Sequence, residues 1–221
     1  MSLSDAVAFA TLETLRDELG LADNSQDGRL ERYDLQASAA IQAYCDREFR
    51  KEATTERLAG SGTQRLVLSR TPLVSIASVV IDGETIDADE YEIEDAAAGI
   101  LYRENGWPRL DNVVAGSISR DSMAGTGKAD IVVTYTGGYV LPNDTVGTRN
   151  LPVEIEQACI LTVTSLFRGR GRDRAVASKA TGDASISYRL PNQIIGVGAG
   201  GVIPDEAVGL LAKFRRFTRV S

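Results

Sequence analysis

Three glycines near the C-terminus have the spacing of a dinucleotide-binding loop. In IIGVGAGGVIP, Gly196, Gly198 and Gly201 form the pattern G-x-G-x-x-G, whose backbone cradles a pyrophosphate where a strand leads into a helix. That chemistry also requires a second strand and an acidic residue about twenty positions further on. Thr218 stands near the position of the acid, and no second strand pattern follows. We therefore interpret the segment as a glycine hinge without a nucleotide.

The residues needed for most enzyme active sites are missing from the sequence. There is no histidine, which excludes most zinc sites, Cys-His dyads and Ser-His-Asp triads. The two cysteines, Cys45 and Cys159, lie at apolar positions of expected helices, so we predict buried thiols. YTGGY (135–139) lacks the Gly-Lys-Ser/Thr step of a phosphate loop, and we interpret it as a sharp turn carrying two half-buried tyrosines. We expect no enzyme activity, no metal site and no cofactor.

Acidic residues gather in two places without the geometry of a site. Glu154 and Glu156 are two positions apart on an expected helix, so they point to different faces, and the helix dipole accounts for acids there. The acids of segment 87–95 lack the glycine and the terminal glutamate of an EF-hand loop. We predict a solvated strand face for this second cluster.

An arginine-glycine run, FRGRGRDR, is the least ordinary stretch of the chain. Guanidinium groups bind phosphates or carboxylates with two parallel hydrogen bonds, and the glycines between them permit close approach. A solvated loop at the C-terminal end of a helix, where cations are favoured, explains the same residues equally well. The sequence leaves both interpretations open for Arg168, Arg170, Arg172 and Arg174.

Length and charge restrict the class of protein further. The 221 residues suffice for one large domain or two small ones, and 43% hydrophobic residues with 25% charged residues are typical of globular proteins. The net charge of −7 divides into +6 over residues 168–221 and −13 over the remainder, so an acidic body carries a basic C-terminal quarter. We expect no membrane span and no secretory signal.

Apolar periodicity predicts helices near both ends of the chain. The first is TLETLRDELGL, with Thr11 as N-cap and Gly20 at its end. A second stripe runs from Leu30 to about Phe49. Two further helices open at Pro152 and Pro204, each expected as the first helical residue.

The middle of the chain changes to a strand-like period of two. Turn signals include IDGE (81–84) and the glycine at 99. The predicted strands are 55–59, 65–68, 76–81, 91–94, 100–102 and 129–135, and 108–128 is expected to be a loop. We predict an α+β fold in which terminal helices form a small helical bundle with an inserted antiparallel β-domain. The expected limits are 1–52 and 151–221 for the bundle and 53–150 for the β-domain.

Six segments, in this order, carry a resemblance to a known family. They are TLETLRDELGL, LQASAAIQAYCDREF, LSRTPLVSIASVVIDGE, YEIEDAAAGILYRENGW, IVVTYTGGYVLP and LPVEIEQACILTVTSLFRGRGRD. Together they resemble the head-tail connector (adaptor) proteins of tailed bacteriophages, over about residues 11–217. The most specific element is the alanine-rich helix with its Tyr-Cys pair, followed later by VTYTGGY.

The resemblance implies a structural virion protein, made in the host cytoplasm and resident in the neck. Such proteins form a ring, usually of twelve copies, that binds the portal protein, extends the DNA channel without binding DNA specifically, and docks head-closure or tail proteins. A head-closure or tail-side virion protein, or an unrelated scaffold module, is the alternative. The resemblance implies portal-binding residues in the last segment: Lys213, Arg215, Arg216, Phe217 and Arg219. The arginines of FRGRGRDR would line the channel or a subunit interface.

Overall fold

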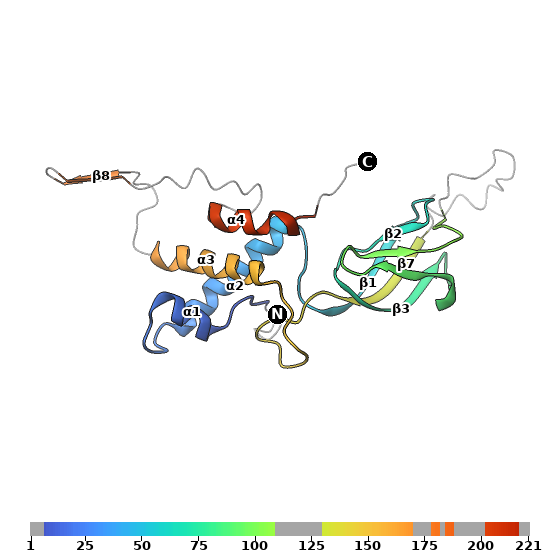
Figure 1. Cartoon of the computed structure of the whole chain (residues 1–221), viewed down its shortest axis with the longest axis horizontal. Coiled ribbons are helices and arrows are strands. Elements are labelled where there is room, and N and C mark those ends of the chain that lie inside the picture. The colour runs from blue at the N-terminus through green and yellow to red at the C-terminus, as the bar shows by residue number, and fades with distance from the viewer. Residues whose placement is uncertain (1–6, 109–129, 170–177, 182–183, 188–201, 217–221) are drawn as a thin grey trace. The chain divides into compact units, whose positions relative to one another are not determined.

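The chain forms two compact units. The computed structural model describes residues 7–108, 130–169, 178–181, 184–187 and 202–216 (Figure 1). Contacts divide the chain into a helical unit, Met1–Arg47 with Val140–Ser221, and a β-unit, Glu48–Tyr139. The terminal segments therefore supply the helices and the middle supplies the antiparallel strands. The predicted α+β class, a terminal helical bundle with an inserted antiparallel β-domain, is confirmed.

Helix α1, Leu12–Leu19, begins and ends at the residues that the local sequence predicts. The Thr11 side chain accepts a hydrogen bond from the Thr14 N–H at 3.1 Å, which satisfies one of the donors left free at a helix N-terminus. Gly20 takes a left-handed conformation with φ 65°, a conformation that glycine adopts without steric cost, and its N–H bonds back to the last turn.

Helix α2, Asp27–Cys45, ends four residues before the predicted limit at Phe49. Asp46 closes it in a left-handed conformation with φ 51°, and its N–H donates to the Gln42 carbonyl. Aspartate is one of the few side chains that tolerate this backbone. Phe49 is fully buried, but it belongs to the β-unit. The apolar pattern of the sequence therefore extends beyond the end of the helix, because Phe49 is buried in the β-unit and not in the helical unit.

Helix α3, Val153–Arg168, contacts α1, α2 and α4 (Asp205–Leu211) and so forms the centre of the helical unit (Figure 1). Its buried apolar residues are Ile155, Ala158, Cys159, Ile160, Val163, Leu166 and Phe167. Burial of each large apolar side chain contributes roughly 1.5–3 kcal/mol. In the part of the chain that the structure describes, no helix is long and apolar enough to cross a membrane.

Helix α4, Asp205–Leu211, continues into a short 3-10 turn, η6, Ala212–Phe214. Pro152 and Pro204 precede α3 and α4 as N-cap residues, one position earlier than predicted. Ala212, the first residue of this turn, is exposed, because the tighter 3-10 turn changes the direction of the side chains that follow α4.

Two small antiparallel sheets build the β-unit. The first has the order β1 (Glu52–Ala59), β7 (Asp130–Gly137), β3 (Leu73–Ile81), β4 (Glu84–Thr85), and the second has the order β2 (Arg65–Val67), β6 (Ile100–Tyr102), β5 (Glu92–Asp95). A short 3-10 turn, η2 (Ala88–Glu90), precedes β5. Inward-facing side chains of both sheets form one core around Trp107, Leu101, Val133 and Tyr135.

The turn chemistry of the β-unit follows the sequence. Asp82 and Gly83 both have positive φ, 50° and 91°, and connect β3 to β4 as the Asp-Gly signal predicted. Gly99, with φ 77°, closes the turn before β6. All six predicted strands are present with limits shifted by at most three residues, whereas β4 is a strand the sequence did not predict. The expected loop at 108–128 lies almost wholly outside the described residues.

A second feature that the sequence did not predict is a two-stranded ladder between α3 and α4. Strand β8, Ser178–Thr181, pairs antiparallel with β9, Ala184–Ser187. Their sequences, SKAT and ASIS, are too short and too polar to show a clear period of two. The ladder forms a sheet of its own among the described residues.

Candidate interaction surfaces

The described part of the basic C-terminal segment is tied to the helical unit. Phe214 is buried, and its carbonyl accepts a hydrogen bond from the Arg47 guanidinium at 3.4 Å. The Arg216 N–H donates to the Cys45 carbonyl at 2.8 Å, at the end of α2. The Arg215 guanidinium lies 5.4 Å from the centre of the Tyr44 ring, within the range of a cation-π contact.

The predicted portal-binding residues therefore differ in their surroundings. Lys213 Nζ donates to Glu154 Oε1 at 2.6 Å, and this hydrogen bond lowers the pKa of the Glu154 carboxyl. Both side chains are substantially exposed, so solvent screens the pair and it contributes little to the stability of the fold. Arg215 is exposed and Arg216 is half-buried. Phe217 and Arg219 lie outside the described residues.

Arg168 is the last residue of α3 and is exposed. The N–H of Gly169 donates to the Ser165 carbonyl at 2.9 Å, and the helix ends there. A cation at this end is favoured by the helix dipole. The other predicted arginines, Arg170, Arg172 and Arg174, lie outside the described residues, so their grouping with Arg168 stays a prediction.

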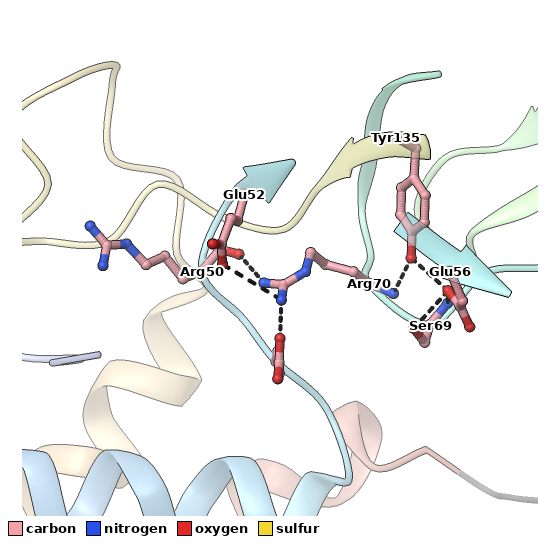
Figure 2. Close-up of polar contacts among 7 residues, drawn as sticks. Arg50, Glu52, Glu56, Ser69, Arg70 and Tyr135 are labelled. Carbon is pink, nitrogen blue, oxygen red and sulfur yellow. Dashed lines mark hydrogen bonds and ion pairs between the residues drawn. The ribbon is translucent and has the colours of Figure 1, made fainter. Parts of the chain in front are cut away.

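A buried arginine, which was not predicted from the sequence, contacts the first residues of the β-unit. Arg70 is only 9% exposed, and its guanidinium donates to the Arg50 carbonyl at 2.8 Å (Figure 2). It also forms ion pairs with Glu48 and, at 3.7 Å, with Glu52. Burial lowers the pKa of Arg70, and the Arg50 carbonyl and the two carboxylates are the partners of its guanidinium group. These contacts hold three residues that precede or begin β1 against the segment before β3.

The backbone of Arg70 joins a second group of polar contacts. Its N–H donates to the Tyr135 hydroxyl at 3.0 Å, and that hydroxyl donates to Glu56 Oε2 at 2.8 Å (Figure 2). The same carboxylate oxygen accepts hydrogen bonds from the N–H and the hydroxyl of Ser69, at 2.9 and 2.8 Å. Burial raises the pKa of Tyr135, so its hydroxyl keeps the proton that it donates. The sequence offered one signal, the TYTGGY segment, and its use could not be deduced without the fold.

The two glycines of that segment are required by close backbone approach. A Cβ on Gly137 would lie 2.4 Å from the Arg70 carbonyl oxygen, and one on Gly138 would lie 2.4 Å from the Arg50 carbonyl oxygen. Gly138 also has φ 104°. The interpretation of YTGGY as a structural turn agrees with this geometry. Tyr139 is half-buried as predicted, but Tyr135 is completely buried, because its hydroxyl has partners inside the unit.

The helical unit contains a buried carboxyl group that the sequence did not reveal. Asp34 is 3% exposed and accepts hydrogen bonds from the Cys159 thiol at 3.1 Å and the Ser38 hydroxyl at 3.2 Å. Ser38 in turn accepts the N–H of Phe9 at 3.1 Å. Burial raises the pKa of Asp34. The group links α2 and α3 to the segment before α1 and has no access to substrate.

The structure contains two chemical features that the sequence predicted, the buried thiols and the exposed acidic strand. Both thiols are buried as predicted, and burial raises the pKa of Cys45 to about 12, which makes it a poor nucleophile. The four residues of β5 are all exposed, in agreement with a solvated acidic face. Among the described residues, no group of three or more potential ligands could hold a metal ion. The glycines of the nucleotide-like pattern lie outside the described residues.

Comparisons with known proteins place this fold. A chain of a structure described as "Neck of empty GTA particle computed with C6 symmetry" is 16% identical, with a TM-score of 0.52 over 100% of this chain and 95% of that one. A chain of "Virion of native gene transfer agent (GTA) particle" is 13% identical, with a TM-score of 0.54 over 97% of this chain and 92% of that one. Identities this low show a shared fold. No curated protein matches the chain.

The helical unit centred on α3 and the two antiparallel sheets of the β-unit make this an α+β protein. A family model described as head completion protein matches residues 8–195, which is most of the sequence. The chain belongs to the head completion protein family. The resemblance to head-tail connector proteins inferred from the sequence is thereby confirmed, and the role of the chain is a structural one at the head-tail junction.

Proposed function

We propose that the protein forms a ring beneath the portal at the capsid vertex, extends the DNA channel and offers a docking surface to head-closure or tail proteins. The observation that carries this proposal is the family match over residues 8–195, together with a fold shared along the whole chain with a neck protein. We propose twelve copies and residence in the virion neck. The inserted β-rich domain, expected at 53–150, and the bundle around it would be the two parts of each ring subunit.

The C-terminal segment is proposed to contact the portal protein. Its described start is anchored on α2 through Phe214 and the Arg216 N–H, so the residues that follow leave from a fixed point. Lys213 is partly engaged with Glu154, which leaves Arg215, Arg216 and Arg219 as the cations for an acidic portal surface. Aromatic Phe217 would supply apolar contact. Exposed charge pairs of this kind direct association and weaken as salt rises.

We propose that the acidic surface of the β-unit lets DNA slide through the channel without binding it. Segment 82–95, DGETIDADEYEIED, contains eight acids and no lysine or arginine. An acidic surface repels phosphates, whereas each neutralised phosphate would add salt-dependent affinity and slow the passage of DNA. The arginines from Arg168 to Arg174 would then line the channel at a separate place or bridge neighbouring subunits.

Electron microscopy of the protein mixed with purified portal rings of the same particle tests the proposal. We expect a second ring stacked on the portal, and its absence with both proteins folded would contradict the proposal. Removing Lys213 onward would also remove buried Phe214, so the tail is better tested by a double variant, Arg215→Ser with Arg219→Ser. We expect portal affinity about tenfold lower at low salt.

A matched control separates a specific tail contact from a general loss of charge. Arg29 and Arg32 are exposed on α2, and replacing both by serine changes the net charge by the same amount. This variant should bind the portal like the wild type.

A separate variant tests the arginine run. Replacement of Arg168, Arg170, Arg172 and Arg174 by serine should impair ring assembly or DNA retention. Unchanged values of both would discard that role.

The family description also favours a second position, that of a head-closure protein docked on another ring. The two positions differ in their immediate neighbour. A connector binds isolated portal rings directly, whereas a closure protein binds only after a connector ring is present. Adding the candidate connector before or after this protein would distinguish them.

A further inference from the structure

The hairpin β8–β9 cannot account for its own stability. Each strand has four residues, and the two pair only with each other among the described residues. An isolated two-stranded ladder is marginally stable at best in water. Both of its outer edges also carry N–H and C=O groups that no strand in the described part of the chain satisfies. A further strand along one edge would stabilise it.

The β-unit has one long, regular edge able to supply that strand. Among the strands that the structure describes, β1 is an edge strand of eight residues, and its pairing with β7 runs without a register shift from Glu52 to Ala59. None of its eight residues is buried. It contains no proline and no bulge, two of the usual devices against strand addition, and only three of its eight residues are charged.

The other edges of the β-unit are poor acceptors by the same criteria. β4 has two residues and β2 has three, too few for a ladder of four. β5 has the right length, but three of its four residues are acidic and its register shifts between Ile93 and Asp95. Acidic side chains and bulges are known to discourage edge pairing. This leaves β1 as the acceptor.

Covalent geometry allows the hairpin to reach outside its own bundle. Nine residues lie between α3 and β8, and seventeen lie between β9 and α4. At about 3.3 Å per extended residue, these connections span at most about 30 and 56 Å. Both distances are comparable with the size of a small neighbouring domain.

We propose that the β8–β9 hairpin of one copy adds to the outer edge of β1 in the β-unit of a second copy. The hydrogen bonds of the new ladder join backbone groups, so the contact depends on strand length and regularity more than on side-chain identity. Repeated around a closed ring, each copy donates one hairpin and accepts one, which is a heterologous interface. The inference rests on the proposed ring, because the ring supplies the second copy.

Photo-crosslinking in the assembled portal complex tests this arrangement. Exposed Ala53 on β1 is replaced by p-benzoylphenylalanine, and exposed Glu92 on β5 carries the same probe in a matched control. Equal amounts of protein labelled with ¹⁴N and with ¹⁵N are mixed before assembly. We expect cross-links from position 53 to residues 178–187 in mixed-isotope pairs, which only two copies can produce, and few such cross-links from position 92.

Several results would overturn the proposal. The proposal is wrong if position 53 cross-links only within one copy, to its own hairpin or to segment 109–129, or if it cross-links to another virion protein.

A hairpin variant gives a second test. Replacing residues 178–187 with a Gly-Ser linker of equal length should abolish the mixed-isotope cross-links while Trp107 fluorescence stays native. If the wild-type protein forms a ring without these cross-links, strand addition is wrong and the proposed function stands. If no ring forms, both fail.

Discussion

The hydroxyl of Tyr135 offers a sharp test of the β-unit, because this one oxygen forms hydrogen bonds with two partners, the buried N–H of Arg70 and the half-buried carboxylate of Glu56. Replacing Tyr135 with phenylalanine keeps the ring in the core and removes only the hydrogen bonds to the Arg70 N–H, at 3.0 Å, and to Glu56, at 2.8 Å. The ring is completely buried, so water does not replace the lost partner without rearrangement.

The expected loss follows from the partners that remain. Glu56 keeps two hydrogen bonds from Ser69, so it loses one of three donors. The Arg70 N–H loses the only hydrogen bond described for it. An unsatisfied buried donor costs about 1–3 kcal/mol, and a hydrogen bond to a charged group contributes about 1.5–3 kcal/mol. Since Glu56 is partly compensated, we expect the free energy of unfolding of the β-unit to fall by about 2–4 kcal/mol.

Urea unfolding followed by tryptophan fluorescence measures this loss in the right unit. Trp107 is the only tryptophan, is 1% exposed and belongs to the β-unit core, so its emission reports on that unit. With a slope of about 1.5 kcal/mol per M, the midpoint should fall by about 1–3 M. Tyr139→Phe is the matched control and should change the midpoint little. A Tyr135→Phe midpoint equal to that of the wild type would refute the assigned contacts.

Two further substitutions and one pH profile test other parts of the structure. Gly138→Ala places a Cβ 2.4 Å from a backbone oxygen at φ 104°, so we expect at least about 2 kcal/mol of destabilisation by the same fluorescence assay. Gly28→Ala, in α2 with nothing within 4 Å of the new Cβ, should instead stabilise the helical unit by about 0.5 kcal/mol, measured by circular dichroism; a loss there would contradict the open site. Burial raises the folded-state pKa of Asp34, so stability present below its unfolded pKa of about 3.9 should decline as the pH rises through the raised value. Asp34→Asn should flatten that decline in urea titrations monitored by circular dichroism, and parallel profiles would show that another group titrates.

The sequence predicted the ends of helices and strands correctly where a single residue, such as a capping or turn residue, determines them. Thr11 and Gly20 delimit α1 because a hydroxyl cap and a left-handed glycine act over one turn. The Asp-Gly turn at Asp82 acts in the same way. The predicted end of α2, at Phe49, was wrong because Asp46 terminates the helix while the apolar residues continue into the β-unit. Hairpin β8–β9 was missed because strands of only four residues, SKAT and ASIS, are too short to show a period of two.

The interaction surfaces were predictable only in outline. The charge asymmetry of the chain indicated a basic C-terminal segment, and the structure shows that Phe214 and Arg216 anchor its start. The sequence could not indicate that Lys213 meets Glu154, since 59 positions separate them. Likewise, Arg70 and Tyr135 are 65 positions apart and meet only when two strands pair. Contacts of this range depend on topology, which the pattern of one segment does not contain.

Native mass spectrometry of the protein bound to portal rings tests the central claim most directly, because it counts the copies in the complex. A connector ring predicts one copy of this protein for each portal subunit, in a complex that holds together at low salt and loses copies as salt rises. A mass equal to that of the portal ring alone, with both components folded, would contradict a connector that binds the portal.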